Sequence, residues 1–170
     1  VVSKADSLFA EVDSCYNQLR KRASLSSSSL SIVSELKSGS AWYVPGGCST
    51  IGRLFNDACG RYAFAEDKHS GSIPLAFETV FDKAGDADVW TIKYNRDRDM
   101  TYSDLKADYI GYTGFKAFKT RNIYGCNTAK VPFYEETPFR PDYLLSDLIQ
   151  ILHPEIGDLG GLRYFCKLNE

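Results

Sequence analysis

The chain has 170 residues, of which 44% are hydrophobic and 25% are charged, and its formal net charge is -2. This length and composition are typical of one globular domain with its own core. The small net charge gives no bulk attraction to nucleic acid, and the apolar runs are too short to span a bilayer, so we expect neither a nucleic-acid partner nor a membrane-spanning helix.

The predicted elements alternate between helix and strand along the chain. An apolar stripe with three-and-four spacing predicts a helix over 3–23, and the serine-rich segment 25–31 follows it as a loop. Strands are predicted at 31–36 (SIVSEL), 41–44 (AWYV), 61–65 (RYAFA), 88–94 (DVWTIKY) and 122–126 (NIYGC), and helices at 51–58, 77–84, 102–109 and 141–152.

The alternation predicts the fold class. Parallel strands need crossover helices, so strands that alternate with helices favour a parallel or mostly parallel sheet. We predict an α/β fold, a three-layer α/β/α sandwich with a mostly parallel sheet. The final helix has the clearest bounds, because Pro141 suits a first helical turn and Pro154 suits a stop.

The five cysteines show no metal-ligand spacing. Cys15, Cys48, Cys59, Cys126 and Cys166 are far apart and form no CxxC pair, so we predict no zinc site and no other metal or cofactor. Scattered cysteines of this kind are more often small buried hydrophobes than a disulfide framework.

The segment WYVPGGCSTIG joins a predicted strand to a predicted helix and has three interpretations. It matches neither GxGxxG nor GxxxxGK[ST], and Arg53 already lies inside the helix, so a phosphate loop is disfavoured. The favoured interpretation is a tight turn, with the glycines permitting it and Ser49 or Thr50 capping the helix.

The third interpretation of this segment makes Cys48 a nucleophile at a strand-to-helix turn. Such chemistry needs a base, and the only imidazoles are His69 in a polar loop and His153 in a helix-ending His-Pro. Carboxylates at 66, 67, 135 and 136 could pair as in a glycosidase, but solvated loop acids are the commoner case. We expect a protein that is not an enzyme and keep a cell-envelope enzyme using Cys48 as the alternative.

Aromatic residues make up 14% of the chain, and several fall where predicted strands end. In open α/β sheets ligands bind beyond the carboxyl ends of strands, so Trp42, Tyr43, Phe133 and Tyr134 are candidates to line a cleft. Core packing is an equal alternative for Trp42, whereas a position at the surface or cleft is favoured for Phe133 and Tyr134.

Several segments in order carry a resemblance to a known family. WYVPGG, DKHSGSIPLAFETVFDKAGDADVW, FKAFKTRNIYGCNT and FRPDYLLSDLIQILHPE together resemble the C-terminal lobe of periplasmic substrate-binding proteins of ABC importers. The chain is most similar to bacterial surface lipoproteins for uptake of ferric siderophores, haem or vitamin B12, as found in Bacteroides-like organisms. The resemblance covers nearly the whole chain, to the tail LRYFCKL.

The resemblance implies two α/β lobes joined by one long helix, with the ligand held between them. Residues 1–24 would be the end of the connecting helix and 25–170 the C-terminal lobe, and the N-terminal lobe would be absent from this chain. The protein would lie in the periplasm or cell envelope, anchored through an N-terminal lipoprotein signal outside this chain.

The resemblance also implies roles for particular residues. Glu78 would dock on the membrane permease, and an iron-siderophore, haem or cobalamin-type ligand would be captured between the lobes and delivered there. The implied ligand contacts come from three loops, with Trp42, Tyr43, Lys68, His69, Ser70, Phe133 and Tyr134 as the candidate residues. The bulky, acidic KVPFYEET argues against a strongly anionic bare siderophore, although Lys68, Lys130 and Arg140 could compensate.

Overall fold

The computed structural model describes the backbone of residues 2–170 and the side chains from residue 5 onward. Its first element is the helix α1 (Val2–Ser24), which agrees with the predicted amphipathic helix. Val1, the first residue of the predicted connecting helix, lies outside the described residues.

A five-stranded sheet with the order β4-β1-β6-β7-β8 lies at the centre of the molecule. Its strands are β1 (Ser31–Ser34), β4 (Arg61–Tyr62), β6 (Val89–Tyr94), β7 (Ile123–Asn127) and β8 (Cys166–Lys167). The first four are parallel, and β8 pairs antiparallel with β7. The prediction of a mostly parallel sheet is therefore confirmed.

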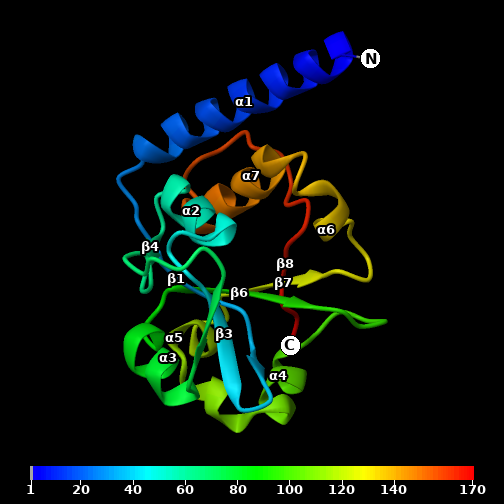
Figure 1. Cartoon of the computed structure of the whole chain (residues 1–170). Helices are drawn as coiled ribbons and strands as arrows, with labels where there is room; N and C mark the ends of the chain where they lie inside the picture. Colours follow the sequence, from blue (N-terminus) through cyan, green and yellow to red (C-terminus); the bar gives the residue numbers. More distant parts are fainter. Residues whose placement is uncertain (1) are drawn as a thin grey trace.

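Helices cover both faces of this sheet (Figure 1). One layer holds α1, α2 (Thr50–Asp57) and α7 (Pro141–Leu152), and the other holds α3 (Phe77–Ala84), α4 (Tyr102–Asp108), the 3-10 helix η1 (Ile110–Gly114) and α5 (Lys116–Lys119). A short helix, α6 (Phe133–Glu136), follows β7. The three-layer α/β/α sandwich is confirmed.

The AWYV segment does not join the central sheet. It forms β3 (Ala41–Pro45), the middle strand of a small antiparallel sheet with β2 (Lys37–Ser38) and β5 (Ser72–Leu75). Side chains alternate across such a strand, so Trp42 is buried while Tyr43 is exposed. The prediction that these rings follow a strand of the parallel sheet is wrong.

The turn after β3 contains the N-cap of α2. Ser49 Oγ accepts a hydrogen bond from the Gly52 amide at 3.0 Å, which is the predicted N-cap. Side chains at Gly46 and Gly47 would collide with the backbone carbonyls of His69 and Ala65, so these glycines allow two loops to touch. Close packing accounts for the glycine pair.

Among the described residues, no helix is both long enough and apolar enough to cross a bilayer.

Candidate ligand-binding edge of the central sheet

The order of the strands defines one edge of the sheet as the candidate site. From β1 the chain passes through α2 to β4 on one side, and then through α3 to β6 on the other side of β1. The two connecting helices lie on opposite faces (Figure 1). Ligands of open α/β sheets bind beyond the carboxyl ends of the strands at such a reversal, here between β1 and β6.

An ion pair lies at this point of the edge. The Lys93 ammonium near the end of β6 pairs with the carboxylate of Glu35, the residue that follows β1. Both side chains are largely buried, with exposed fractions of 17% for Lys93 and 21% for Glu35. The Lys93 ammonium also lies 5.6 Å from the centre of the Phe133 ring.

The backbone holds Glu35 in an unusual conformation. Its φ angle is 70°, in the left-handed region that non-glycine residues rarely adopt. Its amide donates to the Thr91 carbonyl at 2.9 Å, and its own carbonyl accepts a hydrogen bond from the Trp90 indole at 2.8 Å. Local strain that the surrounding structure fixes in this way is a recurrent property of functional sites.

The two aromatic residues of α6 have different roles. Tyr134 is 62% exposed, and its ring contacts that of Phe133 edge to face, with centroids 5.3 Å apart. Phe133 is buried, and its ring also packs on Tyr164. The prediction that Phe133 lies at the surface or cleft is therefore wrong, because the first residue of α6 faces the core.

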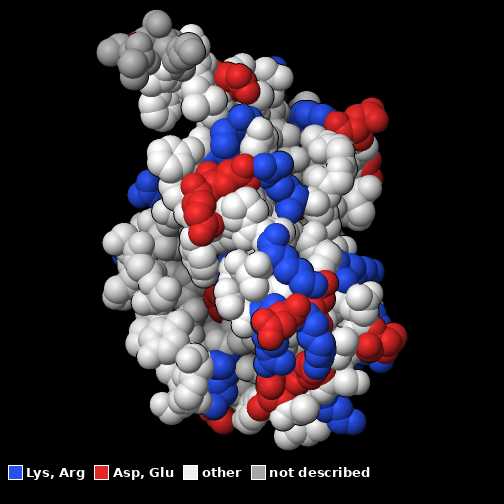
Figure 2. Space-filling model, turned by 90° about the vertical axis from the view of Figure 1, so that its right-hand side faces the viewer, with Lys and Arg blue, Asp and Glu red and all other residues white. Residues whose placement is uncertain are grey.

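Charged side chains cover this edge as ion pairs. The carboxyl ends of β6 and β7 point to the right in Figure 1, and Figure 2 looks onto that side, where positive and negative residues are interleaved. The loops after these strands supply the pair Lys130–Asp99 at 3.0 Å, and Arg98 from the loop after β6 pairs with Asp104 in the first turn of α4 at 2.7 Å. The Arg98 guanidinium lowers the pKa of Asp104 well below its usual range, so both groups stay charged.

The acidic segment KVPFYEET is partly neutralised within the fold. Glu136 accepts hydrogen bonds from the Arg163 guanidinium and, at 2.7 Å, from the Tyr164 hydroxyl. Arg163 lowers the pKa of this carboxyl, which therefore stays ionised beside its partner. Glu136 thus does not repel an anion as strongly as its sequence context indicates.

Trp42 belongs to the core. It is fully buried, its ring stacks on Trp90 with centroids 5.6 Å apart, and its indole donates to the Ser34 carbonyl at 2.9 Å. A ligand at the surface cannot contact a ring with no exposed area, so the prediction that Trp42 lines the cleft is corrected. Its neighbour Tyr43 is 49% exposed.

The candidate loop residues Lys68, His69 and Ser70 are all exposed. Their loop leads into β5, and the imidazole Nδ1 of His69 lies 3.0 Å from Asp67 Oδ1. The small sheet positions this loop, whereas Tyr134 is positioned by the helix that follows β7. The candidate ligand contacts therefore lie on two separate parts of the fold, the loop before β5 and the helix α6.

The match to a known family decides the identity of the chain. The sequence model described as periplasmic binding protein matches residues 2–129. The chain belongs to this family.

The similar proteins agree with this membership. An uncharacterized lipoprotein of Methanocaldococcus jannaschii is 31% identical over 128 residues, which are 75% of this chain and 30% of that lipoprotein. The fold is similar to that of S. aureus IsdE complexed with heme, with a TM-score of 0.69 and 16% identity over 89% of this chain and 58% of that one. It is also similar to an ABC-type Fe3+-hydroxamate transport system protein of Saccharomonospora viridis, with a TM-score of 0.67 and 14% identity over 87% of this chain and 49% of that one.

The chain spans less than two thirds of the length of each of these three proteins. At 16% and 14% identity the two solved structures establish a shared fold only. None of the three source organisms is Bacteroides-like, so that part of the resemblance has no support.

The surroundings of Cys48 in this periplasmic binding protein do not form a nucleophilic site. Neither imidazole is directed to its thiol: His153 is fully buried against the Ala58 carbonyl at 2.7 Å and Ser26 Oγ at 3.0 Å, and His69 pairs with Asp67. The family consists of binding proteins, so the enzyme alternative has no support. In the described part of the chain no group of three or more His, Cys, Asp or Glu side chains is arranged to hold a metal ion.

Glu78 lies in the first turn of α3 and is exposed. A carboxylate there is favoured by the helix dipole, and no side chain caps this helix. An open hollow of about 790 Å³ lies beside it and is also lined by Phe81, Asp82 and Lys119. The surface around the hollow therefore carries the carboxylates of Glu78 and Asp82 beside the ammonium of Lys119.

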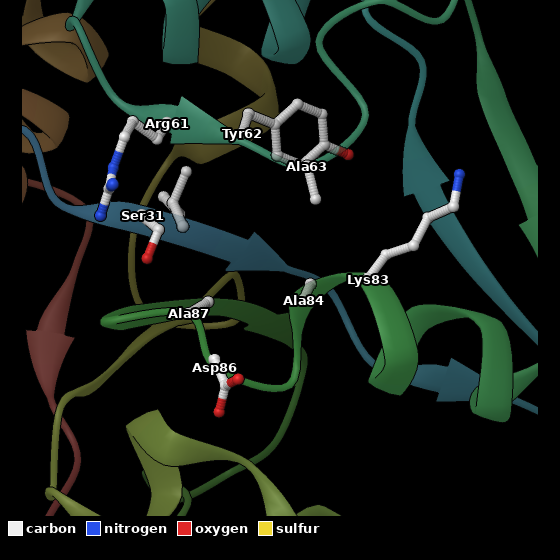
Figure 3. Close-up of a pocket in the computed structure, with 9 residues that line it drawn as sticks. Ser31, Arg61, Tyr62, Ala63, Lys83, Ala84, Asp86 and Ala87 are labelled. Carbon is white, nitrogen blue, oxygen red and sulfur yellow. The ribbon is translucent and has the colours of Figure 1, made fainter.

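A second hollow, of about 370 Å³, lies at the amino-terminal edge of the sheet, where β1 and β4 begin. Alanines form much of its wall, and the charged ends of Arg61, Lys83 and Asp86 point away from one another (Figure 3). Binding sites need polar groups that converge on the ligand. The carboxyl edge is therefore the better candidate.

Glu35 and Lys93 were not among the candidate residues predicted from the sequence. Lysine is rare inside buried strands, and Lys93 is the one charged residue of the strand VWTIKY, so its presence there was the available signal. The partner follows another strand, and only the register of β1 on β6 brings the two together.

Proposed function

We propose that this chain is one lobe of the solute-binding component of an ABC uptake system. The ligand would be held between the carboxyl edge of the sheet and a second lobe, and would be delivered to a membrane permease. The observation that carries the proposal is the Glu35–Lys93 ion pair at the strand reversal of a periplasmic binding protein, with the Phe133 ring beside the ammonium and the exposed Tyr134 ring next to Phe133.

In this proposal residues 1–24 are the end of a connecting helix and 25–170 are the C-terminal lobe. The N-terminal lobe belongs to the same full-length protein. The lipoprotein of M. jannaschii supports a place in the periplasm or cell envelope with a lipid anchor outside this chain.

We propose an iron-siderophore, haem or cobalamin-type ligand. The heme complex of IsdE and the Fe3+-hydroxamate protein share this fold, which supports the first two classes. Tyr134 would supply a stacking face, and Tyr43 with Lys68, His69 and Ser70 would contact the ligand from the rim of the small sheet.

Titration of the full-length protein tests this function. Haem, cobalamin and a ferric hydroxamate are added separately while tryptophan fluorescence is followed, and we expect saturable binding of at least one of them. If no member of the three classes binds saturably, the proposed function is wrong.

Tyr134→Ala should weaken ligand binding about tenfold, because an exposed ring that stacks on a ligand contributes roughly 0.5–1.5 kcal/mol beyond its buried area. The dissociation constant of the full-length variant is measured by the same titration. Ile110→Ala, at an equally exposed apolar residue of η1, is the control and should bind as the wild type does. Equal affinities for both variants would remove Tyr134 from the site.

Glu78→Ala should leave the dissociation constant unchanged and lower the uptake rate several-fold, because a rim charge mainly accelerates and orients docking. Uptake of labelled ligand by cells with the matching permease is the measurement. Asp13→Ala removes an exposed carboxylate from α1 instead and should transport normally. Normal uptake with the Glu78 variant would refute the docking role.

A further inference from the structure

We propose that Lys93 binds a carboxylate of the ligand, and that Glu35 is the group that holds this ammonium while the site is empty. The inference rests on the proposed function and narrows its ligand to a flat, conjugated molecule that bears carboxylates.

The Lys93 ammonium has more hydrogen-bond donors than protein partners. An ammonium carries three N–H groups and no acceptor. Among the described residues, Glu35 is its one hydrogen-bond partner, and the centre of the Phe133 ring lies 5.6 Å away. The other N–H groups therefore have no acceptor among the described residues and can donate to a ligand.

The partial burial of this ammonium makes it a selective group. A lysine in a buried strand costs free energy unless its charge is paired. Charge–charge attraction is stronger at a site with 17% exposure than in water, because less solvent screens it. A ligand carboxylate would gain more here than at the exposed lysines of the same edge.

The backbone conformation of Glu35 presents its carboxylate to Lys93. Its left-handed backbone is fixed by hydrogen bonds to Thr91 and Trp90, so its carboxylate is presented to β6 at a cost in backbone strain. The paired arrangement avoids an isolated buried ammonium in the empty protein. When a ligand carboxylate arrives, Glu35 competes with it for the same ammonium.

The space around the pair sets where the carboxylate lies. Lys93 lines a narrow slot together with Ser34, Thr91 and Leu148, and the slot has a volume of about 10 Å³, which is room for one water molecule. A ligand ring therefore does not fit inside this slot. The exposed Tyr134 ring packs on Phe133, whose ring centre lies 5.6 Å from the ammonium, so a flat conjugated ring that stacks on Tyr134 can bring its carboxylate to Lys93.

A comparison of haem with its dimethyl ester isolates the contribution of the carboxylates to binding. Both are titrated into the full-length protein, and we expect haem to bind about tenfold more tightly than the ester, as for a charge-assisted hydrogen bond. Lys93→Gln should abolish this preference and Lys93→Arg should keep most of it. Lys106→Gln, which removes an exposed lysine of α4, should keep all of it.

Glu35→Gln distinguishes a ligand site from a structural ion pair. If Glu35 competes with the ligand, this variant should bind haem several-fold more tightly. If the ion pair only supports the fold, its loss should weaken haem binding in both single variants. The double variant Glu35→Gln with Lys93→Gln leaves no unpaired charge, so it tests the preference even if Lys93→Gln alone does not fold. It should bind haem and ester equally.

A preference for haem over its ester that survives the loss of Lys93 would overturn this inference, as would equal binding of both by the wild type. A wild type that binds only cobalamin or a ferric hydroxamate would also overturn it, and the proposed function would stand. Failure of all three ligand classes to bind would refute the proposed function itself.

Discussion

Trp42→Ala should lower the free energy of unfolding by about 3–5 kcal/mol, the range measured for removing large aromatic side chains from cores. The indole packs on Trp90, Phe115 and Tyr112 at centroid distances of 5.6, 5.5 and 5.7 Å. Its loss would leave a cavity between the small sheet and the central sheet, and the Ser34 carbonyl without its donor. Denaturant unfolding followed by far-ultraviolet circular dichroism measures the effect.

The adjacent residue provides the control. Tyr43→Ala truncates a half-exposed ring on the same strand and should change stability far less than the Trp42 variant does. A Trp42 variant that unfolds like the wild type but loses ligand affinity would return Trp42 to the cleft and contradict its assignment to the core.

Asp147→Asn should lower the free energy of unfolding by about 2–3 kcal/mol, the scale of hydrogen bonds to a buried charge. The buried carboxylate of this α7 residue accepts the amides of Arg163, Tyr164 and Phe165 at 2.8, 2.8 and 3.2 Å. An amide side chain has one oxygen, so part of this set is lost. Hydrogen exchange should show faster exchange at residues 163–165.

Asp158→Asn is the matched control in the same C-terminal segment, because its side chain is exposed and asparagine tolerates its positive φ of 59°. It should leave both stability and exchange unchanged. Unchanged exchange at 163–165 in the Asp147 variant would show that this carboxylate does not hold the segment. Greater mobility of residues 163–165 would also release Arg163 from Glu136, and α6 would be disturbed.

Local patterns predicted most of the fold. The helix expected at 77–84 has those bounds in α3, and the helix expected at 141–152 has those bounds in α7, because periodic apolar residues and prolines define them locally. The strand expected at 41–44 exists, but its sheet was assigned wrongly. A strand sequence specifies which side chains alternate and does not specify its partners.

The candidate site was less predictable for the same reason. Alternation allowed two orientations of Trp42 and Tyr43, and only pairing with β5 shows which ring faces the core. Phe133 and Tyr134 are neighbours on a one-turn helix that no pattern indicated. Glu35 and Lys93 lie far apart in sequence, and the register of two parallel strands joins them.

The acidic segment shows how sequence alone can mislead about ligand charge. KVPFYEET argues against a strongly anionic bare siderophore, yet one of its two glutamates is held by Arg163 and Tyr164. The ammonium of Lys93 lies 5.6 Å from the centre of the buried Phe133 ring, and the exposed Tyr134 ring packs on the same Phe133 ring. The charge available to a ligand therefore follows from the pairing and not from the count of acidic residues.

In the proposed function the ligand occupies the carboxyl edge of the sheet. Hydrogen exchange of the full-length protein with and without bound ligand, read by mass spectrometry, tests this position of the ligand. We predict slower exchange on binding at residues 93–98, which cover the end of β6 and the loop after it, and at residues 128–136, which follow β7 and include α6. Protection confined to residues 61–63 and 83–87, around the hollow at the opposite edge, would contradict it.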